Sequence, residues 1–306
     1  MLRAMDSAVA GLRAHQNKLD VIGNNIANVN TFGFKAQTFS FKEAMYQTST
    51  NSTKGSTTAG GVNAAQYGYG TMMGSISTDM SSSTPTYVGG LNATISGEGF
   101  FITYPSADKD IQVSDMKKTD FNYTRVGQFN IDANGYLVDS NGNFVYGFRP
   151  DDVSSPTRFE GNLKPIKAPD DVTGSNFNGT ALQLKDVKIN DLGEITGTVV
   201  STDANKSGKT VSLGKVAVAT FQNPQGLSKK GSYYYGASES DNSGTASATI
   251  PGGSTSKLMT GYLEASNVDL AKEFSDMITT QRGFQANSKI ITVSDEILSD
   301  LINMKR

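Results

Sequence analysis

Both ends of the chain carry amphipathic helix patterns, and the long segment between them does not. In residues 1–30 and 268–306, apolar side chains recur at steps of three and four residues, as on one face of an α-helix. The first series is Leu2, Met5, Val9, Leu12, Leu19, Ile22 and Ile26, with Gln16 interrupting it. The second is Leu270, Phe274, Met277, Phe284, Ile291 and Leu301, interrupted by Gln281 and Ser288. The sequence therefore predicts one helix at each end.

Two stripes of near-3.5-residue period indicate that the terminal helices pair as a coiled coil. Polar residues within such a stripe fix the register at some cost in stability, which would be the role of Gln16, Gln281 and Ser288. Periodicity alone is equally consistent with two ordinary helices that each bury one face against a core. The pattern by itself leaves both interpretations open.

Length and composition exclude several classes of function. The chain has 306 residues, enough for two domains, and its formal net charge of −2 leaves no basic patch for nucleic acid. It contains no cysteine, which excludes disulfides and thiolate sites. No apolar run approaches the roughly 18 residues of a membrane span, and the first 20 residues lack the apolar core of a secretory signal. We therefore expect neither nucleic-acid binding nor membrane insertion.

The middle of the chain has the pattern of a β body. Asn134-Gly135 and Asn141-Gly142 each separate short segments of alternating apolar residues, which predicts two consecutive hairpins between residues 129 and 148. Residues 182–189, 195–200 and 211–221 extend the period-two pattern with β-branched side chains. The predicted fold class is α+β and discontinuous: the helices of the two ends form one domain, and the middle forms a mainly antiparallel β body.

Composition also divides the chain into expected domains. Residues 47–61 are almost entirely Ser, Thr, Gly, Ala and Asn, a composition that buries little apolar surface. A similar stretch precedes the second helix. We expect a terminal-helix domain of residues 1–30 and 268–306, connector segments at residues 31–75 and 236–267, and a β-rich body at residues 76–235.

No combination of residues forms a convincing catalytic, cofactor or metal site. The oxygen-bearing residues 132–142 lack the spacing of a calcium loop, and the glycine-rich residues 68–74 match no phosphate-binding spacing. His15 is the single histidine, so zinc or triad chemistry would rest on it alone. Hairpin turns at residues 132–142, a flexible bend at residues 68–74 and a packed or solvated His15 are the simpler interpretations. We expect a protein that is not an enzyme and has no cofactor.

The residues on the helical stripes resemble a known family. The segment from Gly11 to Gln16, followed by residues 19–35, resembles the N-terminal signature of bacterial flagellar rod and hook proteins. Residues 263–287 resemble the C-terminal signature of the same family. The matching signature positions are Asn24, Asn25, Ala27, Asn28, Gly33, Phe34, Lys35, Asn267, Val268, Asp269, Gln281 and Arg282.

Segments of the body are similar to the family as well, at residues 97–101, 123–148 and 219–227, so the resemblance covers nearly the whole chain. Residues 149–175 leave no room for the large outer domain of longer hook proteins. The Gly-Leu-Arg-Ala-His-Gln form of the first motif is most similar to the hook branch. The form of both terminal signatures and the length of 306 residues favour the hook over the distal rod, which stays the alternative. The resemblance therefore implies a short hook subunit that polymerises into a curved, flexible tube joining rod to filament. In that tube the paired terminal helices would form a coiled-coil inner-tube domain, and the β body would form the outer layer.

This resemblance also implies partners and a location. They are other copies of the chain through its terminal helices, the distal rod, the hook cap, the hook–filament junction proteins and the flagellar type III export apparatus. The implied location is the hook of the bacterial flagellum. Curved tubes would support the hook interpretation, whereas straight and stiff tubes would support the distal rod.

Overall fold

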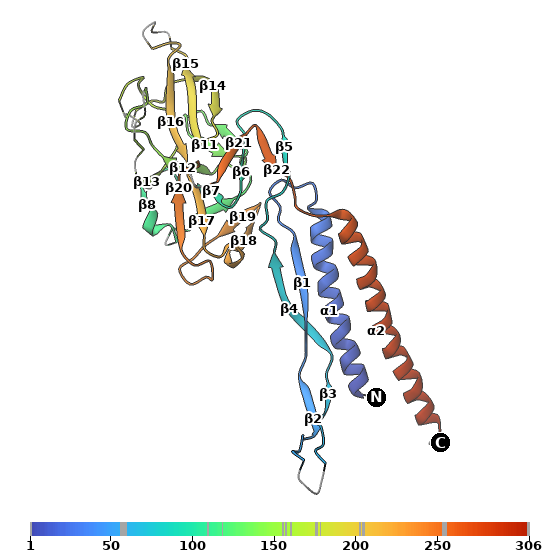
Figure 1. Cartoon of the computed structure of the whole chain (residues 1–306). Coiled ribbons are helices and arrows are strands. Elements are labelled where there is room, and N and C mark those ends of the chain that lie inside the picture. The colour runs from blue at the N-terminus through green and yellow to red at the C-terminus, as the bar shows by residue number, and fades with distance from the viewer. Residues whose placement is uncertain are drawn as a thin grey trace. The chain divides into compact units, whose positions relative to one another are not determined.

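The computed structural model divides the chain into two compact units (Figure 1). It describes residues 2–304 except 56–59, 109, 118, 155, 157, 160, 175–176, 178, 202, 204–205 and 253–255. The helical unit comprises residues 1–29, 36–79 and 268–306, and the body comprises residues 30–35 and 80–267. The chain therefore crosses between the units four times, after residues 29, 35, 79 and 267.

The helical unit contains two long helices that run antiparallel, α1 (Leu2–Ala27) and α2 (Leu270–Met304) (Figure 1). His15 of α1 lies opposite Gly283 of α2, and Gly11 lies opposite Asn287. The predicted helices are confirmed at both ends. None of the helices described in the structure is both long and apolar enough to cross a membrane.

A strand pair covers α1 on another side within the same unit. Strands β1 (Gln37–Glu43) and β4 (Thr71–Thr78) pair antiparallel, and β2 (Tyr46–Thr50) pairs with β3 (Ala65–Gly68). Phe39 is buried, and the ring of Phe41 lies 5.3 Å from that of His15. Helix α1 thus packs against both α2 and the β1–β4 pair (Figure 1).

The body is built from antiparallel strands, fourteen of which join in one sheet among the described residues. Its main path runs β14–β15–β16–β12–β7–β9–β19–β18. The path strands are β14 (Leu184–Ile189), β15 (Glu194–Val199), β16 (Thr210–Val216), β12 (Phe144–Phe148), β7 (Phe100–Tyr104), β9 (Asn122–Thr124), β19 (Tyr234–Gly236) and β18 (Ser228–Gly231). The predicted α+β class with an antiparallel body is confirmed.

Shorter strands and two 3-10 turns complete the body. The remaining sheet strands are β8 (Ile111–Gln112), β10 (Phe129–Ile131), β11 (Leu137–Asp139), β13 (Asn162–Pro165), β17 (Val218–Phe221) and β20 (Ala246–Thr249). Two separate pairs are β5 (Pro85–Tyr87) with β22 (Tyr262–Glu264), and β6 (Ala93–Ser96) with β21 (Lys257–Thr260). The turns are η1 (Val113–Asp115) and η2 (Pro224–Gly226).

The Asn-Gly hairpins form where the sequence predicts them. β10 pairs with β11 and β11 with β12, in antiparallel register. Gly135 and Gly142 adopt φ values of 81° and 80°, which glycine reaches without the steric penalty of a side chain. Large buried side chains such as Phe101, Tyr123 and Tyr146 fill the space on both sides of the sheet. The body therefore has a core of its own.

The unit boundaries differ from the expected domain boundaries in two places. Residues 36–79 form strands within the helical unit, although residues 31–75 were expected to be a connector. Residues 236–267 belong to the body, where β20, β21 and β22 pair with other strands. Ser- and Thr-rich segments bury little apolar surface, yet their backbone groups still pair with neighbouring strands. Part of the first such segment, residues 56–59, lies outside the described residues.

Candidate assembly surface and the network at the unit crossings

Small and polar residues form the contact between α1 and α2. Ala8, Gly11 and Ala14 are buried on α1, as is Thr280 on α2. A Cβ atom added to Gly11 would lie 2.8 Å from the Asn287 side chain. Close contacts of this kind bring the helix backbones together without large apolar side chains. Coiled-coil pairing through the apolar stripes stays a prediction.

Asn25 ties the end of α1 to both of its neighbours. Its Nδ2 donates to the Gln37 carbonyl at 2.8 Å and to Glu273 Oε1 at 3.1 Å, while its Oδ1 accepts from the Gln37 amide at 2.9 Å. Asn25 is fully buried, so these bonds satisfy a side chain that would otherwise be costly to desolvate. Burial raises the pKa of Glu273, and the hydrogen bond from Asn25 opposes that shift.

The start of α2 is capped by Asp269. Its Oδ1 accepts from the amides of Ala271 at 2.9 Å and Lys272 at 3.2 Å. An aspartate in this position satisfies free helix amides and interacts favourably with the helix dipole. Asn28 similarly donates to the Asn24 carbonyl at 2.9 Å in the last turn of α1. These signature residues shape the helix ends.

Many apolar side chains of α2 are exposed. The exposed set in its first half is Leu270, Phe274 and Ile278, and in its second half Ile290, Val293, Ile297, Leu301, Ile302 and Met304; Phe284, between them, is also exposed. The twelve-residue step from 278 to 290 makes three full helical turns and about a third of another. The exposed apolar residues of the first half therefore lie on a different side of α2 from those of the second half. We call these exposed apolar residues the outer stripes.

At its C-terminal end, α2 extends past the N-terminal start of α1, and the outer stripes continue along this extension. Because Gly11 lies opposite Asn287 in an antiparallel pair, α1 begins near the level of residue 296. Ile302 and Met304 are 68% and 82% exposed, the most among the described apolar residues of α2. Contiguous exposed apolar surface is typical of a protein–protein contact.

The predicted stripe residues occupy several environments. Ile22 is buried; Met5, Leu12, Leu19, Ile26, Met277 and Ile291 are partly buried; Val9, Gln16, Leu270, Phe274, Gln281, Phe284 and Leu301 are exposed. Ser288, the remaining interruption, is also exposed. The side chain of Leu2 lies outside the described residues. The roles of these residues in polymerisation and register remain predictions.

His15 is packed between α1, α2 and β1. Its ring would lie 2.7 Å from a Cβ added to Gly283, and its Nδ1 is buried without a hydrogen-bond partner. Burial and, to a lesser extent, the charge of Lys18 lower the pKa of His15 below 6.5. The folded unit therefore favours the neutral imidazole.

This shift gives the helical unit an expected pH dependence. As the pH falls below 6.5, the unfolded chain binds a proton at residue 15 more readily than the folded chain, so the free energy of unfolding decreases from pH 7 towards pH 5. His15→Gln should reduce that decrease, measured as helix loss in denaturant at both pH values. Glu273 titrates in both proteins, so their difference isolates His15. Identical pH slopes would contradict the assignment.

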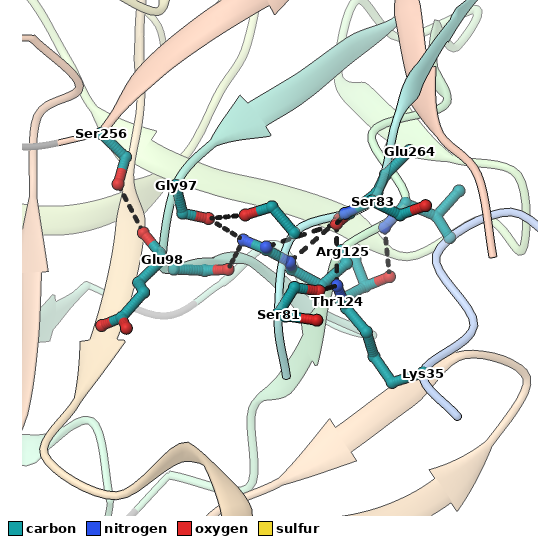
Figure 2. A network of polar contacts seen from close by, with 12 residues as sticks. Lys35, Ser81, Ser83, Gly97, Glu98, Thr124, Arg125, Ser256 and Glu264 are labelled. Carbon is teal, nitrogen blue, oxygen red and sulfur yellow. Dashed lines mark hydrogen bonds and ion pairs between the residues drawn. The ribbon is translucent and has the colours of Figure 1, made fainter. Parts of the chain in front are cut away.

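A buried ionic network lies in the body at the crossings to the helical unit (Figure 2). Lys35 Nζ lies 2.8 Å from Glu264 Oε1, and Arg125 Nε lies 3.0 Å from Glu264 Oε2. The side chains are 1% exposed for Lys35 and 2% for Arg125 and Glu264. One carboxylate therefore holds two buried cations. We call these three residues the Glu264 network.

Main-chain groups complete the Glu264 network. Arg125 Nη1 donates to the carbonyls of Gly97 at 2.8 Å and Gly99 at 2.7 Å, and the Ser83 amide donates to Glu264 Oε1 at 3.0 Å (Figure 2). Lys35 Nζ also donates to the Ser81 carbonyl at 2.5 Å. These bonds satisfy Oε1 of Glu264, whereas Oε2 is held by the ion pair with Arg125 Nε and accepts no hydrogen bond. Arg125 and Glu264 lie in segments that resemble the family, residues 123–148 and 263–287, but the sequence alone did not predict that they form a site.

The other signature positions divide between buried and exposed. Gly33 is buried with φ 68°, and a Cβ there would lie 2.6 Å from Val126. Phe34 receives the ammonium of Lys229 over its ring at 4.9 Å. Asn267 and Val268 are partly buried, whereas Asn24, Ala27, Gln281 and Arg282 are exposed. Some signature residues therefore shape the backbone and packing at the crossings, and others are exposed on the surface.

Three family models match the chain. Residues 5–35 match "Flagella basal body rod protein", residues 94–197 match "Flagellar hook protein FlgE/F/G D1 domain", and residues 259–304 match "Flagellar basal body rod FlgEFG protein C-terminal". The matches fall on α1 with the segment after it, on the body, and on the end of the body with α2.

Relatives that align over their whole length belong to the same kinds of protein as these family models. The chain is 41% identical to the flagellar basal-body rod protein FlgG of Bacillus subtilis over 309 residues, covering all of both chains. It is 31% identical to FlgG of Borreliella burgdorferi over 313 residues, again covering both chains fully. The flagellar hook protein FlgE of the same organism is 25% identical over 455 residues, with full coverage of both.

A helical unit with exposed apolar residues along α2 and a separate antiparallel β body, in a chain with these relatives, define a structural protein rather than an enzyme. The chain belongs to the family of flagellar rod and hook proteins, whose members polymerise into the axial structure of the flagellum.

Proposed function

We propose that this chain is a distal rod subunit of the flagellar basal body. The observation that carries the proposal is the length of this chain compared with the lengths of its rod and hook relatives. An alignment of 309 residues covers both this chain and the Bacillus subtilis rod protein, whereas 455 are needed to cover both this chain and the Borreliella burgdorferi hook protein. The relatives thus favour the alternative over the hook interpretation of the sequence.

The hook interpretation rested on the form of both terminal motifs and on the length of 306 residues, and the lengths of the relatives favour the rod instead. In this chain, residues of the first motif such as Gly11 and His15 pack α1 against α2 and β1, so their role in the structure is local packing. Copies of the chain associate with one another, and the outer stripes are the contact surface between them. The hook cap and the hook–filament junction proteins are expected as partners of a hook subunit only.

Deletion of the gene in the source organism tests the proposal. Electron cryotomography of the deletion strain should show basal bodies whose rod ends before its distal part, and complementation with the intact gene should restore it. A complete rod that lacks only the hook would contradict the rod assignment and support a hook subunit. A complete rod and hook would contradict both.

A further inference from the structure

We propose that the Glu264 network is a latch that holds together, within the body, the four chain segments that cross to the helical unit. When the latch is closed, these segments leave the body from fixed positions. When it opens, the crossing segments loosen while the body core stays folded. The inference rests on contacts inside the body and does not depend on the rod assignment.

Each crossing has a member or neighbour in the network. The segment that follows α1 is held by the Gly33 amide, which donates to the Glu264 carbonyl at 2.8 Å. The return to the helical unit after residue 35 is held by Lys35 itself. The entry after residue 79 supplies the Ser81 carbonyl and the Ser83 amide. Glu264 stands three residues before the exit at residue 267.

Charge makes Glu264 the central member. It is the only carboxylate of the three, and it faces Lys35 and Arg125 at 2.8 and 3.0 Å. Arg125 also places Nη2 3.4 Å from Oε1, so its guanidinium meets both carboxylate oxygens. Without the negative charge, two buried cations would repel each other in a region that excludes water. Loss of that single charge should therefore open the latch.

The core strands have interactions that do not pass through Glu264. β7 pairs with β12 through Phe144–Tyr104 and Val145–Thr103, and both strands lie on the main path of the sheet. Their buried side chains belong to the apolar clusters of the body. The structure therefore allows the crossing segments to open separately from the sheet, as local unfolding units often do.

Residue-resolved hydrogen exchange on the full chain tests the latch. Glu264→Gln keeps the size of the side chain and removes its charge. The amides of Gly33 and Ser83 should exchange at least 10-fold faster, while those of core residues Ile102 and Val145 change less than twofold. Glu98→Gln is the matched control, because the Glu98 side chain is exposed and lies in the same region (Figure 2). It should change neither set.

A second variant keeps the test decisive if Glu264→Gln does not fold. Lys35→Met removes the contacts of Lys35 with Glu264 and with the Ser81 carbonyl, which should loosen the crossing segments. Arg125 stays paired with Glu264, so the remaining buried charges balance and the variant should fold. Faster exchange at Gly33 and Ser83 with an unchanged core supports the latch in either variant. Equal acceleration of crossing and core amides would show an ordinary structural ion pair and overturn the proposal. So would unchanged exchange at Gly33 and Ser83 in a folded variant.

Discussion

Replacing Phe274 by aspartate is expected to abolish polymerisation while leaving the subunit folded. Phe274 is 51% exposed on the first half of the outer stripes, so the single chain loses little packing. In the polymer, the charge of the aspartate would be buried between copies of the chain.

The expected effect is large. An unpaired carboxylate in an interface costs about 3 kcal/mol or more, which corresponds to roughly 100-fold weaker association. Sedimentation and negative-stain microscopy, under conditions in which the unsubstituted chain polymerises, would measure it. Circular dichroism would confirm that the helix content is kept.

The neighbouring Ser275 provides the control. It is exposed and already polar, so Ser275→Asp adds the same charge outside the outer stripes. This variant should assemble nearly as well as the original chain. Normal tubes from Phe274→Asp, or equal loss in both variants, would contradict the assignment of the outer stripes as the contact between copies.

Replacing Gly283 by leucine is expected to separate α1 from α2. A Cβ at this position would lie 2.7 Å from Cε1 and 2.8 Å from Nε2 of the His15 ring, which itself packs against Phe41. Larger side chains forced into a packed contact typically cost about 1–3 kcal/mol. The free energy of unfolding of the helical unit should fall by that amount, measured by denaturant titration of the helix signal.

Gly23 is the matched glycine on α1. Nothing lies within 4 Å of a Cβ added there, and the position is exposed. Gly23→Leu should therefore be neutral or stabilising by up to about 1 kcal/mol, since leucine favours helix more than glycine does. If the two leucine variants have the same effect on stability, the close helix contact at Gly283 does not exist.

Local signals predicted much of the fold. Period-3.6 stripes located both helices, and the Asn-Gly pairs located the β10–β11–β12 hairpins. The partner of each helix face could not be predicted in the same way. An apolar stripe shows which face avoids water, but not whether it meets the same chain or another. Here Gly11, Gly283 and Asn287 form the contact within the chain, and they carry no hydrophobic signal.

The Glu264 network could not be predicted from the sequence for a different reason. Lys35, Arg125 and Glu264 are far apart in sequence, and a single charged residue in a strand or loop is usually solvated. Only the tertiary structure shows that all three are buried together. The strands of residues 36–79 and 236–267 were also missed, because Ser- and Thr-rich composition conceals backbone pairing.

Whether this chain forms a distal rod is tested most directly by the shape of its polymer. Tubes assembled from the purified full-length chain should be imaged by electron cryomicroscopy and their curvature measured along their length. The rod assignment predicts straight, stiff tubes of uniform diameter. Curved or supercoiled tubes would contradict it and restore the hook interpretation.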